Sequence, residues 1–189
     1  MCSRVTKRPL FAFVSTIVRP GDALQTFALS DDYSFGVLQS NAHYHWFHAK
    51  CSNMKSDPRY TSESVFHTFP WPQAPTDAQA DAVAVAAAGR DLRRVRADAA
   101  NDHGTGLRVL YRTLDLPGKN PLKDAHDALD AAVRKAYGFS SKKDLLQQVL
   151  DLNKEVVVRI GDGKGVTGPG MPSTYKTPGA LFTSDCFGA

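Results

Sequence analysis

Residues 54–73 read MKSDPRYTSESVFHTFPWPQ, a charged and aromatic run that ends in Phe-Pro-Trp-Pro. Pro70 and Pro72 remove two backbone donors and push the residues before them into extended geometry. A helix cannot continue through this point. The stretch therefore predicts a boundary at Gln73 to Pro75 between two differently built parts of the chain.

The part before this boundary is expected to mix strands with helix. Residues 10–18 are rich in Phe, Val and Ile, and residues 34–38 follow an Asp-Asp turn signal, so both are predicted as strands. After Gln39 the sequence SNAHYHWFHAKC changes to a helical period, with Ser40 as a possible N-cap. The pattern is typical of a small strand-then-helix unit.

The part after the boundary is predicted to be helical. Thr76 and Gln79 have the spacing of a capping box and open an Ala-rich helix that extends to about Ala99. Apolar residues at helical spacing predict further helices, which are expected at 107–114, 122–136 and 141–156. Gly138 follows the second of these helices and is expected to be its left-handed C-cap.

These patterns predict an α+β fold in three regions. Residues 1–72 form the mixed strand and helix segment, and residues 73–160 form an all-helical domain. Residues 161–189 have frequent Gly and Pro with little periodicity, which predicts a flexible tail.

Composition is that of an ordinary globular protein, with 42% hydrophobic residues. Seven basic and five acidic residues precede Gln73, and sixteen and fourteen follow it, so a polyanion would meet a local patch rather than a charged tail. Three cysteines without a Cys-x-x-Cys pair indicate a reducing, cytoplasmic setting. The sequence contains no apolar run of about 18 residues and no cleavage-site pattern, so neither membrane insertion nor secretion is predicted.

Imidazole and thiol groups, the usual zinc ligands, gather at His43, His45, His48, Cys51 and His67. On a helix, three of them at i, i+3 and i+6 would lie roughly on one face, which would suit a metal-dependent enzyme. The spacings match no recognised zinc pattern, so polar residues on a partly exposed helix are the favoured interpretation and no metal site is predicted. Nucleophile elbows and phosphate-loop fingerprints are also missing, so no catalytic residue is predicted.

Lys55, Asp57 and Arg59 are predicted to point the same way, because side chains at i, i+2 and i+4 of an extended segment share one face. Lys and Arg donate to the O6 and N7 atoms of guanine, and Asp accepts from the N4 amine of cytosine. Lys55 and Asp57 together are therefore suited to reading one G·C pair, and Arg59 adds a second donor that can make two hydrogen bonds. On spacing alone, a solvated turn around Pro58 is the favoured alternative.

A second basic group, on the helix predicted after the boundary, consists of Arg90, Arg93, Arg94 and Arg96. Guanidinium groups at this spacing can hold successive phosphates of a DNA backbone. A solvated helix face with local pairs to nearby aspartates fits the same pattern equally well.

Several blocks resemble the MmeI-like family of type II restriction-modification enzymes and adenine-specific DNA methyltransferases. FGVLQSNAHYHWFHAKCSNMKSDPRYTSESVF and HTFPWPQ look like the closing part of that family's target recognition domain. LYRTLDLPGKNPLKDAHDALDAAVRKAYGF is similar to the family's helical C-terminal domain. The resemblance covers about residues 5–158.

The resemblance implies double-stranded DNA as a partner, with base choice at Lys55, Asp57 and Arg59 and with the first two acting as a pair. The family's Asn-Pro-Pro-Tyr motif and its S-adenosylmethionine motif are absent, since residues 120–123 read only Asn-Pro-Leu-Lys. We therefore expect a recognition module that does not methylate alone and binds no cofactor, with S-adenosylmethionine bound elsewhere in the intact enzyme.

A different class of function is a helical protein-interaction module that docks a separately encoded methyltransferase subunit. Its mark would be an exposed apolar face on the helix predicted at 122–136.

Overall fold

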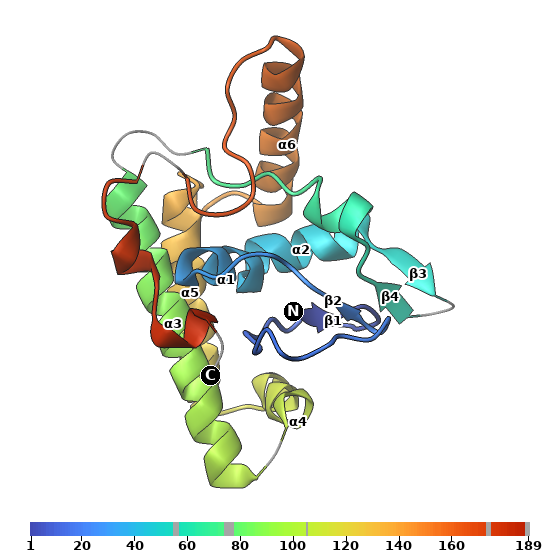
Figure 1. The fold of residues 1–189 in the computed structure, drawn as a ribbon, viewed down its shortest axis with the longest axis vertical. Coiled ribbons are helices and arrows are strands. Elements are labelled where there is room, and N and C mark those ends of the chain that lie inside the picture. The colour runs from blue at the N-terminus through green and yellow to red at the C-terminus, as the bar shows by residue number, and fades with distance from the viewer. Residues whose placement is uncertain (55–56, 74–77, 105, 173–174, 188–189) are drawn as a thin grey trace.

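The computed structural model describes residues 1–54, 57–73, 78–104, 106–172 and 175–187 (Figure 1). The α-helices are α1 (Asp32–Gln39), α2 (Asn41–Lys50), α3 (Ala78–His103), α4 (Leu107–Arg112), α5 (Pro121–Ala136) and α6 (Leu145–Gly161). Two short antiparallel pairs join β1 (Cys2–Ser3) to β2 (Leu24–Gln25) and β3 (Ser52–Met54) to β4 (Asp57–Arg59). Short helical turns are η1 (Ser62–Phe66), η2 (Thr113–Asp115), η3 (Pro178–Leu181) and η4 (Ser184–Phe187). The predicted α+β class is confirmed.

Residues 34–38, predicted as a strand, are part of helix α1. The Asp31 side chain caps this helix by accepting a hydrogen bond from the Ser34 N–H at 2.7 Å. Every residue of the helix is buried, so the apolar residues follow no helical stripe and resemble a buried strand. The strand prediction is wrong because a helix that is buried on all sides lacks the apolar periodicity by which a sequence distinguishes a helix from a buried strand.

Residues 10–18, also predicted as a strand, form no ladder. The Phe11 N–H donates to the Gln39 side-chain oxygen at 2.9 Å, and the Ala12 N–H donates to the Met1 carbonyl at 3.0 Å. The segment therefore satisfies these donors with a helix side chain and with the first residue of the chain. Its apolar character is used to bury Phe11 in the core rather than to build a sheet.

Helix α2 begins after Ser40, as the sequence predicts, but Ser40 does not cap it with its side chain. The Ser40 hydroxyl instead donates to the Val37 carbonyl at 2.8 Å, at the end of α1. Ser40 thus ends one helix and precedes the next. The two helices share this single residue as their joint.

The Phe-Pro-Trp-Pro block is non-helical, as predicted, and both of its aromatic residues are buried. The ring of Phe69 lies edge-on to that of Trp71, with centroids 6.3 Å apart. The Tyr137 hydroxyl, just past α5, donates to the Pro70 carbonyl at 2.9 Å. The block therefore ends the first part of the chain and attaches it to the helical part.

The later helices follow the sequence closely. Helix α3 continues to His103, past the predicted end near Ala99, while Thr76 of the predicted capping box lies outside the described residues. Helix α5 ends as predicted, because Gly138 adopts the left-handed φ of 68°. Helix α6 begins at Leu145, later than the predicted start at 141, because the Asp144 side chain caps it by accepting from the Gln147 N–H at 2.7 Å.

One hydrophobic core extends across residue 73. Helix α1 packs on α3, and α3 packs on α5 along much of its length (Figure 1). Residues 161–189 were predicted to be a flexible tail, yet Leu181 is buried in this core. Figure 1 shows the C-terminal turns lying beside α3, so the end of the chain packs on the helical part.

The close approach of α1 to α3 leads to a stability prediction at Gly36. A Cβ there would lie 2.7 Å from Val85 Cγ1 and 3.0 Å from the Val85 carbonyl oxygen. We expect Gly36→Ala to lower the free energy of unfolding by about 1–3 kcal/mol, because overpacking outweighs the gain in helix propensity. Urea denaturation measures the change. Gly161→Ala, which meets no atom within 4 Å, is the matched control, and equal effects of the two changes would contradict the prediction.

Candidate functional site

The β3–β4 hairpin gains a third chain segment from the N-terminus. Arg59 faces Ser52 on one side and Val5 on the other, in antiparallel register. The Tyr60 N–H donates to the Arg4 carbonyl at 2.6 Å, and the Thr6 N–H donates to the Pro58 carbonyl at 3.0 Å. Strand β4 is therefore the middle of a small three-stranded patch at the edge of the molecule (Figure 1).

The two faces of this patch differ in exposure. Tyr60 and Cys2 are fully or almost fully buried and belong to the core. Asp57 and Arg59 lie two residues apart on β4, so both side chains belong to the opposite, outer face. Asp57 is exposed and Arg59 is partly exposed. The sequence placed these two side chains on one face, and Lys55, the third predicted base reader, lies outside the described residues.

The charged groups on this outer face are not used internally. Within the part of the chain that the structure describes, neither Asp57 nor Arg59 makes a side-chain hydrogen bond or ion pair. By contrast, the nearby Arg4 pairs with Asp22. A partly exposed donor and an exposed acceptor that lack partners among the described residues can bind a ligand without first breaking a contact with those residues.

Packing beneath the patch supports this outer face. The Tyr60 ring stacks on Phe47 of α2 with an interplanar angle of 15° and a centroid distance of 5.7 Å. The Tyr60 hydroxyl lies 3.1 Å from His43 Nε2. Burial lowers the pKa of His43 to about 3, so this ring is neutral near pH 7 and acts as a hydrogen-bonding core residue. Helix α2 therefore holds β4 in place.

The histidines are dispersed among separate contacts. His43 is buried, while His48 Nε2 lies 3.0 Å from the Lys7 carbonyl oxygen and His67 Nε2 lies 3.3 Å from the Ser62 hydroxyl. Among the described residues, no group of three or more His, Cys, Asp or Glu side chains is arranged to hold a metal ion. The predicted helical face therefore forms no ligand cluster in this part of the chain.

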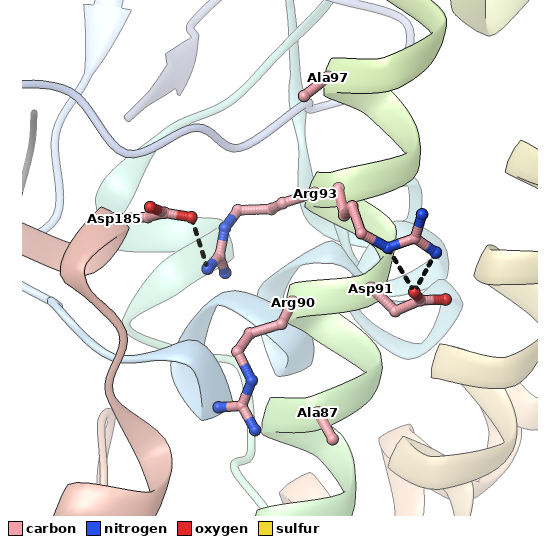
Figure 2. A pocket seen from close by; sticks show the side chains of 7 residues that line it. Ala87, Arg90, Asp91, Arg93, Ala97 and Asp185 are labelled. Carbon is pink, nitrogen blue, oxygen red and sulfur yellow. Dashed lines mark hydrogen bonds and ion pairs between the residues drawn. The ribbon is translucent and has the colours of Figure 1, made fainter.

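The arginines on α3 lie among carboxylates, next to an open pocket of about 500 Å³ (Figure 2). Arg90 and Arg93 both pair with Asp32, whose side chain is fully buried, with N–O distances of 3.0 Å and 2.6 Å. Arg94 pairs with Asp91 and Asp98 on its own helix. Arg90, Arg93 and Arg94 therefore each already have a carboxylate partner.

Arg96 does not belong to an exposed cluster, and its sequence-based placement there is wrong. Its Nε donates to the Tyr111 hydroxyl at 2.7 Å, and its Nη1 donates to the Phe11 carbonyl at 3.1 Å. The Tyr111 hydroxyl in turn lies 2.7 Å from His126 Nε2. These hydrogen bonds join α3, α4 and α5 inside the protein. Burial lowers the pKa of Arg96 and lowers the pKa of His126 to about 3.

The exposed apolar face that was predicted for a protein-interaction module is not found on α5, all of whose residues the structure describes. The apolar face of α5 is buried, including Leu129 and Val133, and it packs on α3. Exposed apolar side chains lie instead at the end of α6, at Val157, Val158 and Ile160. The start of α6 packs on α2, and Figure 1 shows the later turns of α6 extending beyond the other helices.

Sequence reasoning missed the contribution of residues 3–7 to the patch. Exposure alternates along this segment, with Ser3, Val5 and Lys7 exposed and the residues between them less so. The sequence itself does not alternate between apolar and polar residues here, so it carries no strand signal.

Three comparisons relate the chain to known proteins. Residues 10–73 match the family described as the MmeI target recognition domain. Over 130 residues the chain is 31% identical to DNA methyltransferase A of Bacillus subtilis (strain 168). This alignment covers 67% of this chain and 14% of that protein. A solved structure of the type IIL restriction-modification enzyme MmeI in complex with DNA aligns over 83% of this chain and 21% of its own, with a TM-score of 0.68 and 22% identity.

The chain thus spans about a seventh to a fifth of the length of these two proteins. The match to the MmeI structure shows a shared fold that extends beyond the matched domain into the helical part. No helix among the described residues combines the length and the apolar character that a membrane crossing requires.

Proposed function

Residues 10–73 of this chain belong to the MmeI target recognition domain family, and on this premise we propose that the chain is a sequence-specific DNA-recognition module. The observation that carries the proposal is the outer face of β4, where Asp57 and Arg59 share one face and have no side-chain partner among the described residues. A two-stranded β-ribbon fits into the major groove of B-DNA, where base pairs are distinguishable.

The chemistry of the two side chains assigns them a base pair. The Arg59 guanidinium can donate two hydrogen bonds to O6 and N7 of guanine, and the Asp57 carboxylate can accept one from N4 of cytosine. Lys55 is kept as a third proposed reader, although it lies outside the described residues. Together they would read G·C at one position.

Backbone contacts are proposed for Arg90, Arg93 and Arg94, with unequal weight. The pair of Arg94 with Asp91 is exposed, with side-chain exposures of 63% and 53%, and solvent screens such a pair so that it contributes little to stability. Arg94 can therefore exchange a carboxylate for a phosphate at little cost. Arg90 and Arg93 would have to leave a buried carboxylate unpaired, which makes Arg94 the strongest of the three candidates.

In an intact enzyme we propose that this module places one adenine for flipping into a methyltransferase pocket. The methyltransferase domain or subunit would be the protein partner and would bind S-adenosylmethionine. The chain described here would not methylate by itself, because the Asn-Pro-Pro-Tyr motif is absent from its sequence.

Selection with a pool of random DNA duplexes tests the proposed function on the complete 189-residue chain. We expect the retained duplexes to share one short sequence that contains a G·C pair. Competition against the same duplex with a scrambled core should show tighter binding to the selected sequence. Equal binding to all duplexes, or no binding at low salt, would rule out a recognition module in this chain.

Arg59→Ala is expected to weaken binding to the selected duplex by about 1–3 kcal/mol and to relax the guanine preference at one position. Fluorescence anisotropy with single-base variants of the duplex measures both effects. Arg108→Ala is the matched control, because Arg108 is exposed on α4, far from the hairpin in Figure 1. A uniform loss on every sequence would show that Arg59 contacts the backbone instead of a base.

A further inference from the structure

Val5 is an exposed apolar residue directly opposite Arg59, and it lies before the residues that match the target recognition domain. Its exposed fraction is 37%. The flanking hydrogen bonds run from Tyr60 N to Arg4 O and from Thr6 N to Pro58 O, which makes Val5 and Arg59 a non-hydrogen-bonded pair. In such a pair the Cα atoms are about 4.5 Å apart and the side chains are close neighbours on one face.

The outer face of the patch therefore combines charged and apolar chemistry. Asp57 and Arg59 supply an acceptor and a donor on β4, and Val5 supplies a branched apolar group on the adjoining segment. Neighbouring strands lie about 4.8 Å apart, and successive base pairs are separated by about 3.4 Å. A side chain one strand away from Arg59 is thus placed to reach a base pair one or two steps away.

Apolar contact in the major groove has a specific target. The 5-methyl group of thymine is the apolar group that a base pair presents there, and small apolar side chains recognise it. We propose that Val5 reads the methyl group of a thymine next to the base pair contacted by Arg59. This inference rests on the proposed function and extends the base-reading surface from the hairpin to the N-terminal segment.

Replacement of single thymines by deoxyuridine tests the proposal, because it removes only the 5-methyl group. The complete chain and the selected duplex are used, with one thymine replaced at a time. We expect one replacement to weaken binding of the unchanged chain about fourfold, the effect of one methyl group taken out of water. For Val5→Ala, the same replacement should leave the affinity unchanged, since the contact is already lost.

Two further variants separate a lost contact from a disturbed sheet. Val5→Thr keeps the β-branched shape and one methyl group, so it should keep the guanine preference that depends on Arg59 together with part of the response to deoxyuridine. Val109→Ala removes a comparably exposed valine from α4 and should respond to deoxyuridine as the unchanged chain does.

The outcomes distinguish this inference from the function on which it rests. A chain that selects a sequence but responds to no thymine replacement, or responds equally with Val5→Ala, would overturn the role of Val5 alone. A chain without any sequence preference would overturn both the proposed function and the inference.

Discussion

Asp32→Asn is expected to lower the free energy of unfolding by about 3–5 kcal/mol, because it removes the buried charge that pairs with Arg90 and leaves Arg93 with only its longer pair to Asp185, at 3.7 Å. The carboxylate is fully buried and lies between Arg90 and Arg93. It also accepts hydrogen bonds from the Thr183 hydroxyl at 3.4 Å and the Cys186 thiol at 3.3 Å. This one carboxylate therefore connects α1, α3 and the C-terminal segment.

Urea denaturation of the complete chain measures this effect as a lower midpoint at an unchanged slope. Asp91→Asn is the matched control, because Asp91 pairs with Arg94 on the exposed side of α3. That change should lower the free energy of unfolding by at most about 1 kcal/mol. Equal losses for the two variants would show that the buried pairs contribute no more than a surface pair.

Trp46→Ala is expected to lower the free energy of unfolding by about 3–5 kcal/mol, through the cavity that it opens in the core. The Trp46 side chain has no exposed area, and its Nε1 donates to the Val65 carbonyl at 3.0 Å. Its ring centroid lies 6.2 Å from that of Phe69. The residue thus joins α2 to the segment that leads into the Phe-Pro-Trp-Pro block.

The same denaturation experiment tests this prediction, with Ile17→Ala as the control. Ile17 is 84% exposed, so its truncation should change the free energy of unfolding by less than about 0.5 kcal/mol. A Trp46→Ala protein as stable as the control would mean that α2 is not anchored through this side chain.

Local chemistry was sufficient to predict several elements. The helices at 107–114, 122–136 and 141–156 correspond to α4 with η2, to α5 and to α6, because each has an apolar stripe and a cap or break in its own sequence. Gly138 and the proline block ended their segments for reasons that involve only the local backbone. The predicted geometry of Asp57 and Arg59 was of the same kind, since it needs only an extended chain.

Long-range packing decided what these local rules could not. Residues 34–38 were predicted as a strand and are helix, because the whole of α1 is buried and has no exposed face to produce a helical stripe in the sequence. The arginines on α3 show the same limit, since Arg93 and Asp32 are far apart in the sequence and yet lie 2.6 Å apart in space. A spacing of basic residues cannot reveal whether each charge faces solvent or a distant carboxylate.

The sequence by itself determined the α+β class, the change of architecture at Phe69–Pro72, the resemblance to a target recognition domain and the shared face of Asp57 and Arg59. Each of these depends on residues close together in the chain, where backbone geometry and periodicity act directly. Only the tertiary structure decided that Val5 joins that face, that Arg96 is internal and that Asp32 holds Arg90 and Arg93. These outcomes depend on which distant segments share a core, because burial makes unpaired charges and unsatisfied donors costly and so selects their partners.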